Sequence, residues 1–162
     1  MSSTKKCFRI FAVKMMENNG IFWFKTRVSN GKQQVFDPLR RLYVALTPEE
    51  RVRQAVLRHL VEILHYPAGR IAVEYSVCVN GNPQRADIVV FNSDMTPFLI
   101  VECKAASVQL TPKVLDQALR YHSALKASNI LLTNGKTAFC YAIDHQAGTI
   151  TALNEIPPCP NN

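Results

Sequence analysis

Two apolar segments that contain charged residues place the strongest constraint on how this chain can fold. Residues 85–91 (RADIVVF) and 97–104 (PFLIVECK) have the composition of buried strands, yet the first holds Asp87 and the second holds Glu102 and Lys104. Side chains alternate along a strand, so Glu102 and Lys104 project from one face about 7 Å apart. If the two strands pair as neighbours, Asp87 reaches the same point. We therefore predict one cluster of two carboxylates and a lysine.

Such a cluster is costly inside an apolar sheet unless something offsets its charge. A divalent metal would do so, because Mg²⁺ takes oxygen ligands. Asp87, Glu102 and the backbone carbonyl of Cys103 would form part of its shell. Lys104 would orient or help to deprotonate the attacking water and stabilise charge on phosphorus. The alternative is an edge strand whose charged side chains face solvent.

The sequence around these two segments shows the hydrophobic periodicities of helices and strands, in a definite order along the chain. The pattern predicts helices over 48–65 and 111–126, and strands over 71–79, 85–91, 97–104, 129–133 and 137–142. The first three strands are expected to form an antiparallel meander. This α-β-β-β-α-β-β order predicts an α+β or mixed α/β fold in which helices flank a central mixed sheet. Turn signals near the start predict short strands or hairpins there, so the expected division is a basic extension (1–45), a core (46–145) and a C-terminal tail (146–162).

The net charge of +7 is concentrated near the N-terminus. Residues 1–41 hold nine Lys and Arg against two acids, a net of 9 − 2 = +7, and the remaining residues carry ten of each sign. A basic segment on a neutral body suits a polyanion such as DNA, because each phosphate contact releases counterions. The alternative is a solvated N-terminus that contacts no ligand.

Cysteine usage and hydropathy indicate the compartment. The five cysteines form no C-x-x-C pair, which fits a reducing cytoplasm better than a disulfide framework or a zinc site. The opening segment lacks the uninterrupted apolar region of a signal peptide, and no run of about 18 apolar residues could cross a membrane. We expect a cytoplasmic protein without a membrane partner.

Each predicted helix adds polar residues that could serve the cluster. Gln117 and Tyr121 lie one turn apart in the second helix and could hydrogen-bond a phosphate, although spacing alone favours a packed Tyr121 and a surface Gln117. Glu49 and Glu50 open the first helix, where acids also favour the helix dipole. Arg53 is one of several cations that could contact phosphates or remain solvated.

Four runs of sequence resemble a known family when they are taken together. They are FDPLRRLYVALTPEERVRQ, RADIVVF, LIVECKA and DQALRYHSALKASNILLTNGK, and the resemblance covers about residues 35–142. They resemble the N-terminal nuclease domain of type I restriction enzyme R subunits, a branch of the PD-(D/E)XK nuclease superfamily. The resemblance implies a restriction-endonuclease-like core that hydrolyses DNA phosphodiesters with Mg²⁺ or Mn²⁺ and leaves 5′-phosphate and 3′-hydroxyl ends.

The resemblance also implies roles for particular residues. The family's D and E-x-K residues, which bind the metal and carry out hydrolysis, fall on Asp87, Glu102 and Lys104. Its Q-x-x-x-Y motif falls on Gln117 and Tyr121, which implies a supporting role at the site. A first-helix glutamate assists in many members, and we select Glu50 for it, with Glu49 as the alternative.

The sequence departs from the family pattern in two places. Asp87 follows Ala86 rather than proline, and Gly135-Lys136-Thr137 resembles the end of a phosphate-binding loop but has Ile130 where a glycine is required. Translocation and sequence recognition would therefore come from restriction-modification subunits as partners. Cleavage of both DNA strands usually needs two active sites, which a homodimer would supply. The alternative functions are a non-catalytic DNA-binding or complex-assembly module of the same fold, and a phosphodiesterase acting on RNA or a small nucleotide.

Overall fold

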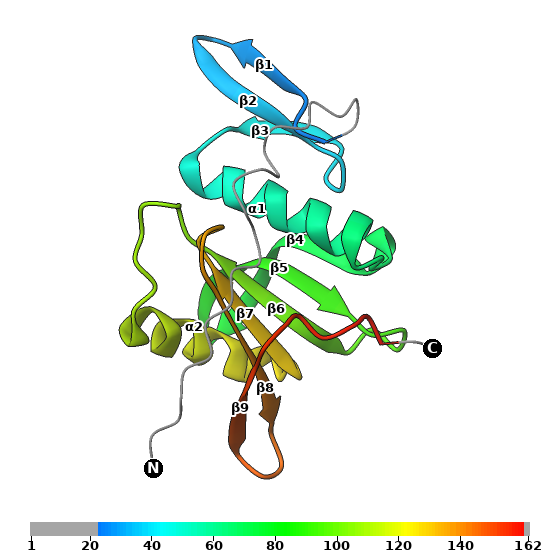
Figure 1. The fold of residues 1–162 in the computed structure, drawn as a ribbon, viewed down its shortest axis with the longest axis vertical. Helices are drawn as coiled ribbons and strands as arrows, with labels where there is room; N and C mark the ends of the chain where they lie inside the picture. The colour runs from blue at the N-terminus through cyan, green and yellow to red at the C-terminus, as the bar shows by residue number, and fades with distance from the viewer. Residues whose placement is uncertain (1–22, 161–162) are drawn as a thin grey trace.

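Residues 23–160 are described by a computed structural model in which two sheets lie on opposite sides of helix α1 (Pro48–Arg58) (Figure 1). The smaller sheet is three-stranded and antiparallel, in the order β1 (Thr26–Ser29), β2 (Lys32–Asp37), β3 (Leu42–Ala45). The larger sheet has six strands in sequence order: β4 (Ile71–Val79), β5 (Asn82–Phe91), β6 (Pro97–Cys103), β7 (Asn129–Thr133), β8 (Ala138–Asp144) and β9 (Thr149–Leu153).

The six-stranded sheet is mixed. Strands β4, β5 and β6 form an antiparallel meander, β6 and β7 are parallel, and β7, β8 and β9 are antiparallel again. Helix α2 (Pro112–Leu125) connects β6 to β7, because parallel neighbours need a crossover connection. The predicted α-β-β-β-α-β-β order, with helices flanking a mixed sheet as in a restriction-endonuclease-like core, is confirmed.

Helix α1 begins where the sequence indicates. The Thr47 hydroxyl accepts a hydrogen bond from the Glu50 backbone N–H (3.0 Å), and Pro48 opens the first turn. Regular α-helix ends at Arg58 and continues as a π-helical turn, η2 (His59–Ile63), after which a 3-10 turn, η3 (Ala68–Arg70), leads into β4. None of the helices in residues 23–160 is long and apolar enough to cross a membrane.

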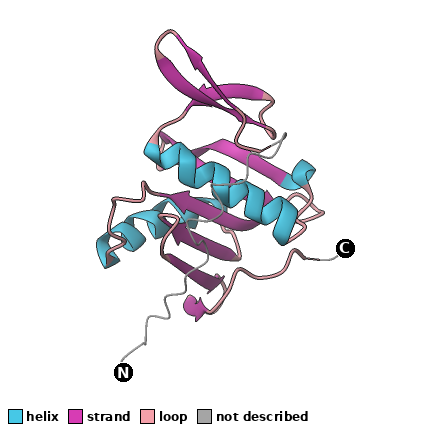
Figure 2. Ribbon diagram, turned by 45° about the horizontal axis from the view of Figure 1, so that its top comes forward, coloured by secondary structure: helices cyan, strands magenta, loops and turns pink. Residues whose placement is uncertain are grey.

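The central strands are buried on both faces, which accounts for their continuous apolar runs. Figure 2 shows α1 lying across the strands, with the smaller sheet beyond it. Apolar residues of α1 and η2 pack on one face of the sheet against Ile88, Leu99, Val101 and Leu131. On the other face, residues of α2 and the turn that follows it pack against Val89, Ile100 and Ile130.

Strand β9 was not expected, because it lies within the segment predicted as a C-terminal tail. It pairs with β8 through a turn in which the Asp144 side chain accepts hydrogen bonds from the N–H groups of Gln146 and Ala147, both 2.9 Å, and Gly148 adopts a φ of +65°. Its side chains are mostly exposed, so the apolar alternation that reveals a half-buried strand is weak here. The expected divisions after residues 45 and 145 stay predictions.

Candidate active site

Asp87 is held through both of its carboxylate oxygens. Its Oδ1 accepts a hydrogen bond from Nη2 of Arg53 on α1 (2.6 Å), and its Oδ2 accepts one from the backbone N–H of Cys103 on β6 (2.7 Å). The first contact joins β5 to the helix above the sheet, and the second joins it to the neighbouring strand. Asp87 therefore sits at a junction of three elements.

The backbone is irregular at this junction. Pairing between β5 and β6 runs as far as Ile88 with Val101, and beyond it the Cys103 N–H binds the Asp87 side chain. On the other side, pairing between β4 and β5 skips Glu74, which has a φ of 52°. A positive φ is unusual for a residue with a side chain, and such irregularities are concentrated near functional sites. At this interruption of strand pairing, the Asp87 side chain points toward α1. Its neighbour Ile88 also packs on the face of the sheet that α1 covers.

Glu102, on β6, is buried beside Asp87 and only 7% exposed. Its Oε1 atom has no hydrogen-bond partner among the described residues. Burial raises the pKa of Glu102 to about 8, and the nearby charge of Asp87 adds to this effect, whereas the charge of Lys104 opposes it. The carboxyl group is therefore largely protonated at neutral pH in the protein alone.

The buried residue that α2 places beside Glu102 is His122. Its Nε2 atom lies 3.9 Å from Oε1 of Glu102, which is too long for a hydrogen bond. Burial lowers the pKa of His122 to about 4, so the ring is neutral at neutral pH. With both groups uncharged, we interpret the contact as two neutral side chains in van der Waals proximity and not as an ion pair.

A network of ion pairs connects Asp87 to the first helix and to the smaller sheet. Arg53, whose side chain is 8% exposed, donates to Asp87 and to Oε2 of Glu50. Oε1 of Glu50 accepts from Nη2 of Arg40 (2.7 Å) and from the amide of Gln54 (2.8 Å). Glu50 is thus linked to Asp87 through Arg53, and both of its oxygens are engaged by residues of α1 and of the turn after β2.

The structure brings three of the predicted site residues together. Asp87 and Glu102 come from adjacent strands, and Lys104, half-buried just beyond the end of β6, lies close enough to affect the pKa of Glu102. Cys103 is fully buried in the core against α1. The structure shows its N–H beside Asp87, and a role for its carbonyl remains a prediction.

The helix residues are placed differently from the strand residues. Gln117 is exposed on α2, and the side chain of Tyr121 lies outside the described residues, so their shared role stays a prediction. Glu49 is half exposed, lies 3.4 Å from Nη2 of Arg53, and its charge also raises the pKa of Glu102. Of the two glutamates in the first turn, Glu49 is therefore the one whose charge reaches Glu102, whereas Glu50 is taken up by the network.

Sequence reasoning missed the partners of the cluster. Arg53, considered as a phosphate contact or a solvated charge, is buried and paired with acids. Its position next to Val52, on the buried side of an amphipathic helix, was the feature from which its burial could have been predicted. His122 follows the buried Ala118 by one helical turn, which is the corresponding signal on α2. Arg40 gave no signal of its role, because only Asp37 among its partners is near in the sequence, and Glu50 and Glu74 lie 10 and 34 residues away.

The donor set is one of carboxylates rather than of histidines or thiols. Among residues 23–160, no group of three or more His, Cys, Asp or Glu side chains is arranged to hold a metal ion. A site here would rest on Asp87 and Glu102 with backbone oxygen, which suits Mg²⁺ and does not suit zinc. The orphaned oxygen of Glu102, beside a second carboxylate, fits such an ion.

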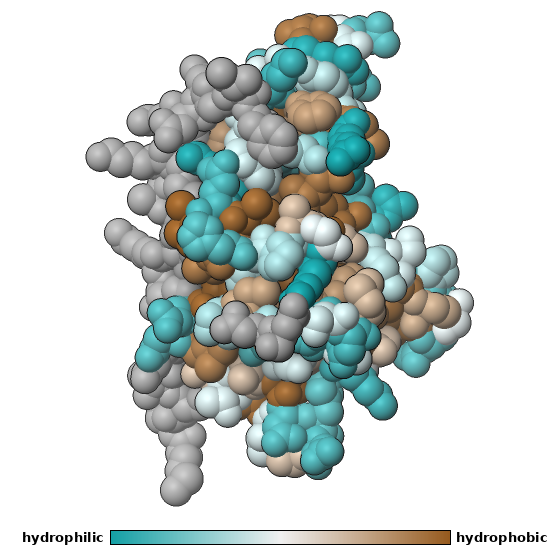
Figure 3. All heavy atoms as spheres, turned by 90° about the vertical axis from the view of Figure 1, so that its right-hand side faces the viewer, coloured by the Kyte–Doolittle hydropathy of each residue, from teal (hydrophilic) through white to brown (hydrophobic). Residues whose placement is uncertain are grey.

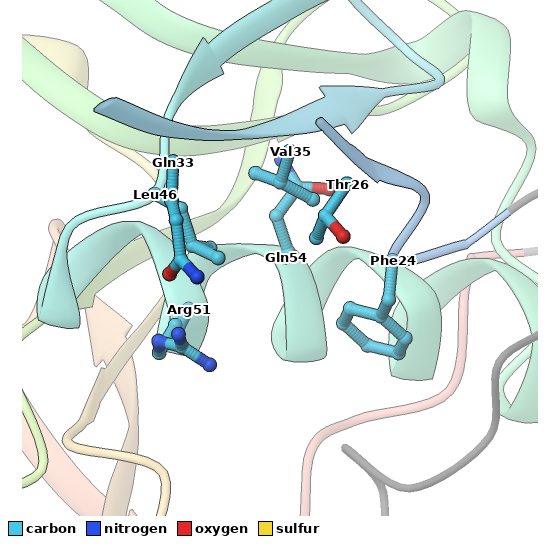
Figure 4. A pocket seen from close by; sticks show the side chains of 7 residues that line it. All are labelled: Phe24, Thr26, Gln33, Val35, Leu46, Arg51 and Gln54. Carbon is cyan, nitrogen blue, oxygen red and sulfur yellow. The ribbon is translucent and has the colours of Figure 1, made fainter. Parts of the chain in front are cut away.

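A cavity of about 260 Å³ lies between the smaller sheet and α1 (Figure 4). Phe24, Thr26, Gln33 and Val35 line it from the side of the smaller sheet, and Arg51 and Gln54 line it from the helix. Gln54 also donates to Asp37 (2.9 Å) and to Glu50, so the cavity borders the ion-pair network. Asp87 and Glu102 do not line it.

Comparison with known proteins assigns the chain to a family. The profile for the type I restriction enzyme R protein N terminus (HSDR_N) matches residues 48–157, which include both helices and all six strands of the larger sheet. No curated protein matches the chain. A solved fragment of a protein assigned as the HsdR subunit of a type I restriction enzyme from Vibrio vulnificus YJ016 is 22% identical, with a TM-score of 0.41. That match covers 54% of this chain and 19% of that chain, so this chain spans about a fifth of its length. On the family profile, the chain belongs to the type I restriction enzyme R protein N-terminal family.

Proposed function

We propose that this chain is a metal-dependent deoxyribonuclease domain that hydrolyses DNA phosphodiester bonds with Mg²⁺ or Mn²⁺. The observation that carries the proposal is the buried Glu102 carboxyl, which has an unpartnered oxygen and lies beside Asp87. Two carboxyl groups that share a site with little water are costly unless a cation offsets their charge. Membership of the R protein N-terminal family supports a nuclease role for the domain.

The charge of the surrounding network favours a divalent cation. Its five acids, Asp37, Glu49, Glu50, Glu74 and Asp87, are offset by three cations, Arg40, Arg53 and Arg85, which leaves a formal charge of 3 − 5 = −2. Asp87 and Glu102 would hold the ion, with the Cys103 carbonyl as a further oxygen ligand. When bound, Mg²⁺ or Mn²⁺ supplies Lewis-acid stabilisation of the charge that develops on the phosphate.

The chain's own residues would complete the site. Lys104, half-buried at the end of β6 and close to Glu102, would orient the attacking water and stabilise negative charge at phosphorus. Gln117 and Tyr121 on α2 would support the substrate phosphate, and a glutamate of the first turn of α1 would assist. The expected products are 5′-phosphate and 3′-hydroxyl ends.

The smaller sheet would contact the DNA backbone. Lys25, Arg27, Lys32 and Arg41 are exposed on it or beside it, and its acid, Asp37, is fully buried. At the top of Figure 3, where this sheet lies, hydrophilic side chains predominate apart from a small hydrophobic patch at the tip. A surface of exposed cations without exposed acids attracts a polyanion and releases its counterions.

Other restriction-modification subunits are the expected partners of this domain. Translocation along DNA and recognition of a sequence would come from other restriction-modification subunits. A homodimer would provide the two active sites that cleavage of both strands usually needs. The domain itself would act in the cytoplasm, where its substrate lies.

The test is cleavage of supercoiled plasmid and of single-stranded DNA by the purified chain with Mg²⁺ or Mn²⁺. Wild type is expected to cut, and Glu102→Gln and Lys104→Ala are expected to lose cutting while remaining folded by circular dichroism. Glu155→Gln, which removes an exposed carboxylate, is the matched control and should cut like wild type. If wild type cuts neither substrate and calorimetry detects no binding of Mn²⁺, the nuclease proposal fails in favour of a DNA-binding or assembly module.

A further inference from the structure

We propose that Arg40 is a positioning residue for the active site. It extends from the turn after β2, outside the six-stranded sheet, and organises the ion pairs that end on Asp87. This role rests on the proposed nuclease function, and it gives the smaller sheet a second task besides contact with DNA. The sheet would then be part of the catalytic architecture rather than a separable arm.

The guanidinium group of Arg40 engages three acids at once. Its Nε lies 2.6 Å from Oδ2 of Asp37, its Nη1 lies 2.7 Å from Oε2 of Glu74, and its Nη2 lies 2.7 Å from Oε1 of Glu50. These acids belong to β2, β4 and α1. A planar guanidinium can span three partners in fixed directions, whereas the single ammonium of lysine cannot. Arg40 therefore joins the smaller sheet, the helix and the edge strand of the larger sheet.

The turn that carries Arg40 is itself fixed. Oδ1 of Asp37 accepts hydrogen bonds from the backbone N–H groups of Leu39 (2.8 Å) and Arg40 (2.9 Å). Oδ2 of Asp37 accepts from the amide of Gln54 as well as from Arg40. Because Asp37 is fully buried and its contacts hold both the backbone and the side chain, Arg40 enters the network in one orientation.

The contacts continue from Arg40 to the proposed metal ligand. Arg40 holds one oxygen of Glu50, and Arg53 holds the other. Arg53 in turn holds Oδ1 of Asp87. Because Glu50 fixes the position of Arg53, it also affects the orientation of the Asp87 carboxylate. A misplacement of about 1 Å at a reacting group can cost about 100-fold in rate. A change at Arg40 is therefore expected to reach the chemistry without touching the substrate.

Arg40 differs in this respect from the other cations of the smaller sheet. All three of its guanidinium nitrogens are engaged by carboxylates, and its side chain is 15% exposed. Its neighbour Arg41 is exposed. If the sheet served only to bind DNA, the exposed Arg41 would matter to affinity and the neutralised Arg40 would not. A comparison of Arg40 variants with Arg41 variants therefore distinguishes a positioning role from a DNA-binding role.

The experiment compares Arg40→Lys with Arg41→Lys in the full chain, because both substitutions preserve net charge. Cleavage is measured at a temperature where circular dichroism shows both variants folded, and kcat and KM for DNA are separated. Arg40→Lys is expected to lower kcat about 10- to 100-fold with KM within about twofold, the range typical of residues that orient metal ligands. Arg41→Lys alters a proposed DNA contact, so any effect of that variant is expected in KM. Arg58→Lys, whose partner Glu62 lies outside the network, is the matched control and should leave both kcat and KM unchanged. Equal kcat values for Arg40→Lys and wild type would overturn the proposal.

A second measurement does not depend on catalysis. Urea unfolding of wild type, Arg40→Lys, Asp87→Ala and the double variant gives a thermodynamic cycle. Each substitution changes the equilibrium constant of unfolding by some factor. If the two residues are coupled through the network, the factor for the double variant differs from the product of the two single factors by at least about threefold. If wild type neither cuts DNA nor binds Mn²⁺, the proposed function fails, and this cycle alone decides whether Arg40 positions Asp87. If the factor for the double variant equals the product of the single factors within the error of the measurement, Arg40 does not position Asp87.

Discussion

Nε2 of His122 lies 3.9 Å from Oε1 of Glu102, and neither atom has a hydrogen-bond partner among the described residues. One comes from α2 and the other from β6, so the contact joins the crossover helix to the strand that carries Glu102. The pKa of Glu102 is raised to about 8 and that of His122 is lowered to about 4. Two groups that ordinarily form an ion pair therefore face one another uncharged.

Glu102→Gln is expected to gain stability over wild type as the pH rises. The folded protein holds the Glu102 proton up to about pH 8, whereas the unfolded chain loses it near the ordinary value of 4.5, so the folded state binds more protons between these values. The free energy of unfolding of wild type then falls relative to the variant by up to about 1.4 kcal/mol per pH unit. Urea unfolding from pH 5 to pH 9 measures this difference. A difference that stays constant with pH would mean that Glu102 titrates normally.

His122→Leu is expected to show the opposite dependence. The pKa of His122 is about 4 in the folded protein and near 6.5 in the unfolded chain, so acid favours the unfolded state between these values. The variant should match wild type near pH 7.5 and exceed it at pH 4 by up to about 3 kcal/mol. Thermal unfolding followed across this range tests the sign. Loss of stability at every pH would show that the ring makes polar contacts that the leucine cannot replace.

The local elements of the fold could be predicted because their signals are local. The β4 and β7 bounds, 71–79 and 129–133, match the expected strands, since apolar runs and flanking turns define them without reference to the rest of the chain. Alternation along the predicted strand put Glu102 and Lys104 on one face, and the expected pairing of β5 with β6, which the structure shows, brought Asp87 to the same strand pair. The two carboxylates were therefore accessible to sequence reasoning.

The environment of those carboxylates could not be predicted from the sequence. Arg53 lies 34 residues from Asp87, and Arg40 lies 34 residues from Glu74, so no periodicity connects them. The positive φ of Glu74 follows from packing at the junction and not from a residue type that favours it. The sequence spacing of His122 does not reveal that its burial leaves it facing an acid.

Arg53→Met is expected to be strongly destabilising. The substitution leaves Glu50 and Asp87 without a principal partner in a site with little water, and loss of one partner from a buried ion pair costs about 3–5 kcal/mol. Glu62→Gln is the matched control, because it removes an exposed (i, i+4) pair with Arg58, which contributes less than about 1 kcal/mol. Urea unfolding of both variants at pH 7 makes the comparison. Equal losses would show that the acids find other donors when Arg53 is absent.

Binding of Mn²⁺ is expected to tighten as the pH rises and to release a proton. A carboxyl must lose its proton to bind a metal, so a Glu102 with a pKa of about 8 makes affinity rise by up to about tenfold per pH unit below that value and level off above it. Calorimetry at pH 6, 7 and 8, in buffers of different ionisation enthalpy, gives both the affinity and the proton count. Glu102→Gln should bind weakly and without this pH dependence, and Glu155→Gln should behave like wild type. Affinity that is flat in wild type, together with the pH-dependent stability expected for Glu102, would place the metal on Asp87 without Glu102. Flat affinity without that stability effect would instead mean that Glu102 is already ionised in the folded protein.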